Sequence, residues 1–289
     1  MKNVKIIFTL LLIAGGSLFY YSCQKDHMSI NPINSQQSGN SSSSLRAESD
    51  EAYMNNEVSY IDDVFQTVLL NNSTVRGFGN LPACATVTYD TSGAVKTATI
   101  DFGATPCQTN GVKEFKQGIL IISWNGNKLD SGTVFTVTTQ NYFVGDTSTI
   151  MHQLQFTKTI TNMGVNAAGD IHFAIVVTDA TLTLDSNQVI TWSANRDREW
   201  VQGDTTTTSD DIYFITGSSS GTDRNGEPFT VQITSPLRSN ADCDWIVSGT
   251  EVVTHGNNSP RTLDYGNGDC DNIVTVTVNG NTIIMHIGG

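Results

Sequence analysis

Residues 273–285 read IVTVTVNGNTIIM, and this stretch indicates how the chain folds. Valine and threonine alternate up to Val278, which is the period of a β-strand with one buried face. Asn279-Gly280 follows, a pair that readily takes the two left-handed conformations of a type I′ turn, and a second strand-like run comes directly after it. The stretch therefore predicts an antiparallel hairpin.

The same pattern continues backwards through most of the chain. Apolar and polar residues alternate in IMHQLQFTKTI (150–160) and in PFTVQIT (228–234), and ISWNGNK (122–128) repeats the Asn-Gly turn signal. Threonine and valine, which suit a pleated surface, dominate these runs. We expect residues 74–289 to form a single all-β domain, either an antiparallel sandwich or a partly closed barrel of about a dozen strands.

Residues 49–73 carry the one helical pattern. Ser49 is a good N-cap, and acids follow at positions 50 and 51, where the helix dipole is positive. Apolar residues then recur at spacings of 4, 3, 4 and 3, which places them on one side of a helix. These residues are Met54, Val58, Ile61, Phe65 and Val68. We expect an amphipathic helix that packs on the sheet.

Two segments of the chain repeat each other. TIDFGATPC (99–107) and TLDYGNGDC (262–270) share the pattern T-[IL]-D-[FY]-G-x-x-x-C, and each has a cysteine upstream. The repeat defines two related units, residues 84–126 and 243–281. A shared origin of the two units explains the likeness better than chance does.

Four cysteines belong to these units: Cys84, Cys107, Cys243 and Cys270. Three disulfide pairings are open, and we favour Cys84–Cys107 with Cys243–Cys270, because each bond then closes one unit. Zinc binding by the four thiols is disfavoured, since there is no C-x-x-C and no clustering with histidine.

The N-terminus has the pattern of an export signal. Lys2 and Lys5 precede an apolar run that is too short to span a membrane. We interpret residues 1–22 as a lipoprotein signal peptide, Cys23 as the lipidated residue, and residues 23–48, rich in Ser, Asn and Gln, as a flexible tether. The alternative is an ordinary secretory signal in which Cys23 is incidental.

The remaining chain is acidic. Loss of the two signal lysines leaves 15 − 2 = 13 basic residues against 28 acidic ones, a formal net charge of −15. Nucleic acid is therefore not an expected partner, because phosphate binding needs a basic surface.

Three features together resemble an uncharacterised group of lipoproteins from Bacteroidota-type bacteria. They are the IDFG…C spacing after an upstream cysteine, the RTLDYGNGDCDN run (261–272) before the last hairpin, and the N-R-x-R-x-W strand (195–200). SCQKD (22–26) also resembles the start of mature lipoproteins in such bacteria, where an acid-containing run directs export to the outer face. The resemblance implies an all-β secreted domain anchored in the outer membrane, at the cell surface rather than facing the periplasm. It brings no catalytic residues.

TWSANRDREW (191–200) is a candidate ligand platform. Period two places Trp192, Arg196, Arg198 and Trp200 on one face, where they could stack on sugar rings. The alternative is structural, with the arginines stacked on the tryptophans to cover a sheet face.

DYGNGDCDN (264–272) is a candidate calcium loop, because oxygen ligands recur there at close spacing. They are Asp264, Asn267, Asp269 and Asp271. The full EF-hand pattern is absent, so an Asp/Gly-rich turn beside a disulfide is the alternative. Beyond this calcium ion, no cofactor is expected.

GSSSG (217–221) matches the G-x-S-x-G pattern around nucleophilic serines, here Ser219. That motif needs a helix after the serine, whereas TDRNGEPFTV (222–231) predicts a turn and another strand. His152 and His172 lie in predicted strands, and we interpret them as structural residues. The motif therefore predicts no nucleophile.

Two classes of function stay open. The absence of a catalytic motif favours a lipid-anchored module for binding or structure, with glycan or surface contact as the concrete form. The alternative is a secreted hydrolase that uses a carboxylate pair from separate strands, and Asp101 with Asp264 is the first pair to consider, because the repeat makes them equivalent. A third role is that of an assembly partner facing the periplasm.

Overall fold

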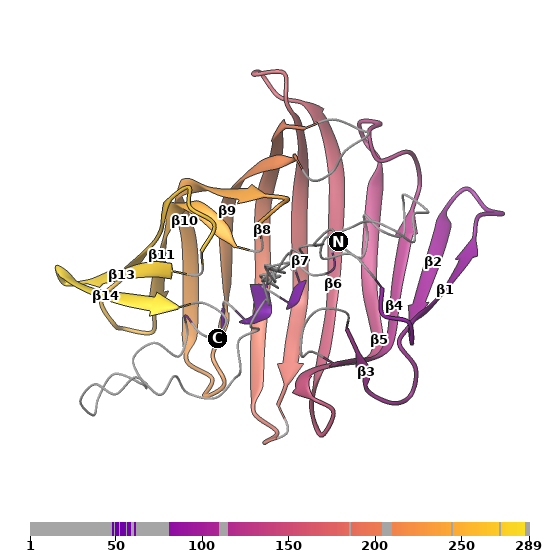
Figure 1. Ribbon diagram of the computed structural model, residues 1–289, viewed down its shortest axis with the longest axis horizontal. Helices are drawn as coiled ribbons and strands as arrows, with labels where there is room; N and C mark the ends of the chain where they lie inside the picture. The colour runs from indigo at the N-terminus through magenta and orange to yellow at the C-terminus, as the bar shows by residue number, and fades with distance from the viewer. Residues whose placement is uncertain are drawn as a thin grey trace, which may run out of the picture.

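The computed structural model describes residues 81–109, 115–184, 186–203, 210–243, 245–271 and 273–286, together with residues 48, 50, 51, 53–55, 57, 58 and 61. The described strands form one antiparallel sheet of 14 strands, which is not closed into a barrel (Figure 1). They are β1 (Thr86–Asp90), β2 (Lys96–Asp101), β3 (Cys107–Gln108), β4 (Phe115–Trp124), β5 (Val134–Thr147), β6 (Ile150–Val165), β7 (Ile171–Thr183), β8 (Val189–Gln202), β9 (Ile212–Thr222), β10 (Pro228–Asn240), β11 (Ile246–His255), β12 (Arg261–Asn267), β13 (Ile273–Val278) and β14 (Asn281–His286).

The sheet is a meander. Each strand pairs with the next one along the chain, except that β3 continues the line of β2 and also pairs with β4. The mainly-β prediction is confirmed, and a single open sheet forms in place of the two sheets of a sandwich. The alternation read from 150–160 and 228–234 is present, with one residue in two buried. The buried apolar residues of these runs are Leu154, Phe156, Ile160, Phe229, Val231 and Ile233.

The two Asn-Gly pairs behave differently. Asn279 and Gly280 have φ values of +49° and +78° and join β13 to β14 directly, as a type I′ turn does. Asn125-Gly126 was expected to form the same turn, and this expectation is wrong. Residues 125–133 form a longer loop, in which Asn125 Oδ1 accepts the backbone N–H of Val134 at 2.8 Å. The Asn125 side chain therefore closes this loop, in place of a two-residue turn formed by Asn125 and Gly126.

Irregular pairing bends the strands. A register shift between Gln117 and Ile119 interrupts the β4–β5 ladder, and further shifts occur in the β5–β6, β6–β7 and β7–β8 ladders. Gly118 at the first shift has a φ of +89°, and a Cβ there would lie 1.8 Å from the carbonyl oxygen of Asn141, so only glycine fits. Bulges of this kind bend a strand and increase its twist, which gives the sheet a concave face.

A helix lies across this concave face. The described residues between 48 and 61 are helical, and Glu48 is already part of the helix, so it begins before the expected N-cap at Ser49. Met54, Val58 and Ile61 of the apolar stripe are buried. The expected stripe positions 65 and 68 lie outside the described residues.

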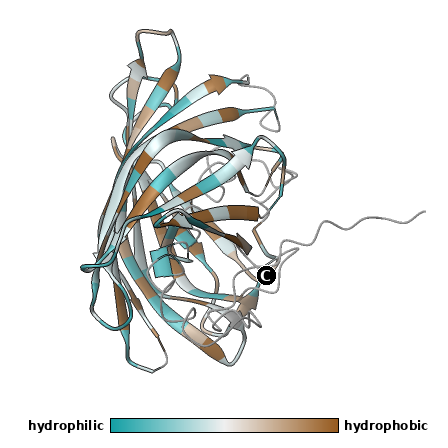
Figure 2. Ribbon diagram, turned by 90° about the vertical axis from the view of Figure 1, so that its left-hand side faces the viewer, coloured by the Kyte–Doolittle hydropathy of each residue, from teal (hydrophilic) through white to brown (hydrophobic). Residues whose placement is uncertain are grey.

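The helix shows how strongly the sheet curls. Residue 48 contacts Arg261 on β12, and residue 57 contacts Lys116 on β4. Nine helical residues rise only about 13.5 Å, whereas β4 and β12, with β5 to β11 between them, would be roughly 38 Å apart in a flat sheet at about 4.8 Å per strand. The sheet must therefore bend around the helix, and Figure 2 shows the strands curving round the helical residues.

Candidate functional site

Buried ion pairs hold the helix at two positions nine residues apart. Lys116 Nζ donates to Glu57 Oε2 at 2.6 Å, with both side chains almost completely buried. At the first described helical residue, the Arg261 guanidinium donates to the Glu48 carboxylate. Lys158 Nζ also donates to the backbone carbonyl of Val58 at 3.1 Å. Buried charges are tolerated only when they are paired, so these contacts fix the position of the helix.

Asp50 makes a multiple contact with Arg224 in the turn between β9 and β10. Arg224 Nε donates to Asp50 Oδ1 at 3.0 Å, and the backbone N–H of Arg224 donates to Oδ2 at 3.0 Å. The Asp50 side chain is fully buried and that of Arg224 is 19% exposed. Hydrogen bonds to an ionised carboxylate are roughly twice as strong as those between neutral groups.

The middle of the helix faces a basic and polar floor. An Arg196 Nη donates to Asn55 Oδ1 at 2.7 Å, and the other contacts Glu51 Oε1 at 3.4 Å. Ser219 Oγ donates to the same Glu51 oxygen at 3.3 Å. Glu51 therefore receives contacts from both β8 and β9.

Glu51 also interacts electrostatically with a second buried acid, Glu251 on β11. The two residues are 3% and 2% exposed, and Glu251 Oε1 accepts the Tyr265 hydroxyl at 2.8 Å. Burial, together with the charge of Glu251, raises the pKa of Glu51 to about 8, while Arg196 opposes the rise. Burial raises the pKa of Glu251 as well. The pair therefore keeps a proton at neutral pH.

Small residues make room for this cluster. GSSSG lies entirely within β9, without the strand–turn–helix arrangement of a nucleophile elbow. Gly217 and Ser219 alternate on the face toward the helix, and a Cβ on Gly217 would lie 2.3 Å from the carbonyl oxygen of Asn195 on β8. The Gly/Ser run thus allows β8 to approach closely and leaves space above it for the Glu51 side chain.

The four residues of the candidate platform separate into two groups. Trp192 is buried, and the Arg196 guanidinium lies 5.6 Å from the centre of its ring, beneath the helix. Arg198 stacks 4.0 Å over the ring of Tyr213, while Trp200 Nε1 donates to the Asp211 carboxylate at 2.9 Å. The arginine–aromatic stacking of the structural alternative is therefore present within the protein.

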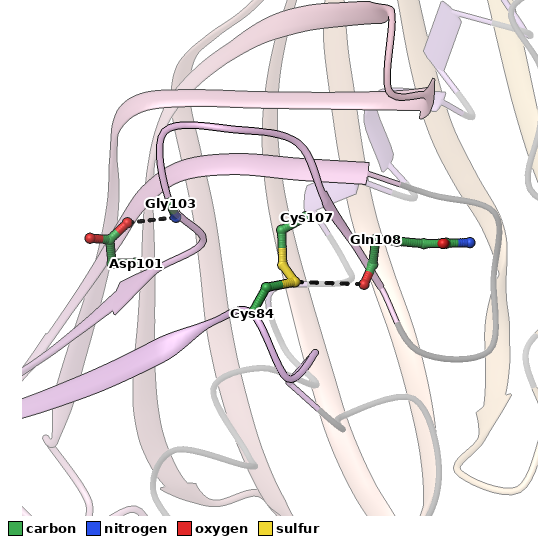
Figure 3. The surroundings of a disulfide bond; sticks show 5 residues. All are labelled: Cys84, Asp101, Gly103, Cys107 and Gln108. Atoms are coloured by element: carbon green, nitrogen blue, oxygen red, sulfur yellow. Dashed lines mark hydrogen bonds between the residues drawn. A yellow bond between two sulfur atoms is a disulfide. The ribbon is translucent and has the colours of Figure 1, made fainter.

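The structure joins Cys84 to Cys107 and Cys243 to Cys270, the pairing favoured by the repeat. Their Cα atoms are 5.9 and 5.8 Å apart. Figure 3 shows the first bond beside Asp101, whose Oδ1 accepts the backbone N–H of Gly103 at 2.7 Å. The second unit has the same turn, with 2.9 Å between Gly266 N and Asp264 Oδ1. The shared aspartate and glycine thus serve one local structure.

Asp101 and Asp264 are not brought together. Asp101 ends β2 and Asp264 lies on β12, at opposite sides of the sheet in Figure 1. Each is exposed and accepts a backbone N–H in its own turn. Two other carboxyls, Glu51 and Glu251, are buried and interact electrostatically, and sequence reasoning missed them.

In the candidate calcium loop, one carboxylate oxygen of Asp264 and one of Asp271 accept local backbone hydrogen bonds. Asp264 Oδ1 is used as described, and Asp271 Oδ1 accepts the backbone N–H of Ile273 at 2.9 Å. Asn267 ends β12, and Asp269 lies in the loop that follows. Within the described ranges, His, Cys, Asp and Glu form no cluster of three or more that could hold a metal ion. Calcium binding at this loop stays a prediction.

The histidines lie on strands. His152 is buried on β6. His172, on β7, places its Nδ1 2.8 Å from Asp197 Oδ2, on the face away from the helix. Among the described residues, no serine or threonine hydroxyl forms a hydrogen bond with this pair.

Apart from Arg196, which was assigned to the candidate platform, the basic residues under the helix were not predicted. One signal for them exists: Lys158 falls between Phe156 and Ile160 on an alternating apolar face, where a lysine needs a buried partner. Lys116 likewise shares a face with Leu120 beyond the bulge. The identity of the partner was not readable, because it lies on a helix far away in the sequence.

Cys23, the signal peptide and residues 24–47 of the predicted tether lie outside the described residues, whereas Glu48, the last residue assigned to the tether, is helical. Where the chain is described, no helix is long and apolar enough to cross a membrane. Comparison with protein-family models, with curated proteins and with solved structures finds no match to the chain.

Proposed function

We propose that the protein is a non-enzymatic β-module, lipidated at Cys23 and held at the outer membrane on the cell surface, where it binds or supports other surface components. One observation carries the proposal: the chain's own helix fills the concave face, at the point where the predicted tether enters the fold. The anchor then holds the domain by its helix. The convex face and the sheet edges remain for contact.

The convex face suits a neutral, polar ligand. One cross-strand row runs over β5 to β9 in exact register, on the side away from the helix. Its members are Thr136, Thr159, Val176, Asn195 and Ser218. In a chain with a net charge of −13, this row of three hydroxyls, one amide and one valine carries no charge, and its four polar side chains can exchange hydrogen bonds with sugar hydroxyls. We therefore propose glycan or surface contact as the concrete role.

A thermal-shift assay of residues 45–289 against a panel of neutral glycans tests this role. A ligand at 100 times its Kd adds about 2.7 kcal/mol, or roughly 5–10 °C in Tm for a domain of this size. Thr159→Lys and Ser218→Lys should abolish the shift without unfolding the domain. Asn257→Lys, in the exposed β11–β12 turn, makes a similar charge change away from that face and should leave it intact.

The outcomes separate the candidate roles. No shift with any glycan would refute glycan contact, and equal loss in all the lysine variants would mean that charge alone is responsible. Protease treatment of intact cells tests the orientation, because a surface protein is cleaved and a periplasm-facing assembly partner is protected.

A secreted hydrolase is the second candidate, and the Glu51–Glu251 pair is the observation that favours it. One protonated and one ionised carboxyl can serve as acid and base. However, Glu51 belongs to the helix itself, so moving the helix to admit a substrate would also remove one member of the pair. If Glu251→Gln abolished a hydrolytic activity while raising Tm, the hydrolase would replace the binding module.

A further inference from the structure

The concave face of the sheet has the chemistry of a receptor for an acidic amphipathic helix. Basic side chains from separate parts of the sheet converge on it, although the whole chain has only 15 Lys and Arg residues. They are Lys116, Lys158, Arg196, Arg224 and Arg261. Their helix partners are the carboxyl groups of Glu48, Asp50, Glu51 and Glu57 and the carbonyl of Val58.

Each hydrogen bond and ion pair described above between the helix and the sheet involves a side chain on at least one side. A helix satisfies its main-chain hydrogen bonds internally, so no backbone ladder has to break when it leaves the sheet. Residues 62–80 connect the helix to Leu81, and at about 3.3 Å per residue they can reach about 65 Å when extended.

We propose that the concave face also accepts the helix of a second copy of this chain, so that two copies exchange helices reciprocally. A second copy carries the same acids at the same spacing, so every ion pair is formed again between copies. The exchange is symmetric and closes on itself, which gives a dimer rather than a chain of subunits. The concave face, called the groove below, is thus an interaction surface whose partner is defined by charge.

Charge reversal tests the exchange. In the full chain, Asp50→Arg places an arginine against Arg224, and Arg224→Asp places an acid against Asp50. Like charges therefore weaken the binding of each variant's helix to the groove of the same chain. In an exchanged pair of the two variants, one groove holds Asp50 with Arg224 and the other holds the reversed pair. The two variants, co-expressed with different C-terminal tags and extracted in detergent, should therefore be captured together.

The expected co-capture is about 100-fold above that of either variant co-expressed with a differently tagged copy of itself, because breaking a buried ion pair costs several kcal/mol. If each variant is degraded alone, rescue of both by co-expression counts as the same result. The control is the double variant Asp50→Arg/Arg224→Asp in one chain, which should fold and be captured no more than wild type.

Equal capture of the mixed and unmixed variants, or no rescue, would overturn the proposal when the double variant folds. If the double variant does not fold, the same experiment is made with Glu57→Lys and Lys116→Glu, and its outcome decides. Because capture depends on helix exchange and not on any ligand, the result is independent of glycan binding.

Discussion

The buried acid pair predicts that the protein loses stability as pH rises through neutrality. The pKa of Glu51 is raised from 4.5 to about 8 in the folded protein, first by burial and then by the charge of Glu251. Between these values the folded protein holds a proton that the unfolded chain has lost. The contribution of this proton to the free energy of unfolding is therefore fully present below about pH 4.5. It falls as pH rises toward 8, by up to about 1.4 kcal/mol per pH unit.

The magnitude is large enough to measure. From pH 5 to pH 7.5 the slope amounts to about 3 kcal/mol, which is roughly 6–12 °C in Tm for a domain of this size. Glu51→Gln keeps the shape of the protonated acid and cannot ionise. We expect the variant to have a smaller fall in Tm over this range than wild type, and to be the more stable protein at pH 7.5.

Circular dichroism melts of wild type and Glu51→Gln, made in parallel from pH 5 to 8, give the result as a difference in which other titrating groups cancel. Glu227→Gln makes the same chemical change at an exposed site and measures the effect of the substitution itself. Wild type and Glu51→Gln falling by the same amount, within about 1 °C, would refute the reasoning, because the proton would then not reside on this pair.

Three other predictions follow from the contacts and the N-terminal pattern. Asp50→Asn and Arg224→Met should each lower the free energy of unfolding in urea by about 3–5 kcal/mol, whereas the double variant Asp50→Leu/Arg224→Met should recover most of this loss. Equal losses in the single and double variants would mean that this ion pair does not hold the helix. Cys107→Ser and Cys270→Ser should each cost roughly 3 kcal/mol, since each disulfide closes a loop of comparable length, and a loss below about 1 kcal/mol in either would contradict this. Cys23→Ser should move the protein from the membrane fraction to the soluble fraction, and a variant that still sediments with membranes would exclude lipidation as the anchor.

The β architecture was readable because its signals are local. Alternation gives the strands, and Asn279-Gly280 gives the last turn, since both depend on residues that are neighbours in the chain. The disulfide pairing was readable because the repeat compares the chain with itself. The turn prediction at Asn125-Gly126 was wrong, because this loop is closed by a hydrogen bond from the Val134 backbone N–H to the Asn125 side chain, which the dipeptide does not reveal.

The central site was not readable, because its contacts cross most of the chain. Asp50 and Glu51 suggested a favourable interaction with the helix dipole, whereas both are buried against arginines more than 140 residues away. Trp192 and Arg196 suggested an exposed platform for the same reason: alternation gives the face of a strand, but not what covers that face. The curl that places a helix over these strands comes from bulges spread over several ladders.

Two cations that bind the helix occupy different positions in the two repeated units, although the units share a sequence pattern. Lys116 belongs to unit 84–126 and Arg261 to unit 243–281, so the helix ties one disulfide-closed unit to the other. The two bases are not equivalent in the repeat, because Arg261 precedes the shared threonine whereas Lys116 follows the shared cysteine. Related units alone would accept the helix in either direction. The unequal placement of the two cations, set against acids at 48 and 57, therefore selects one direction and one register for the helix.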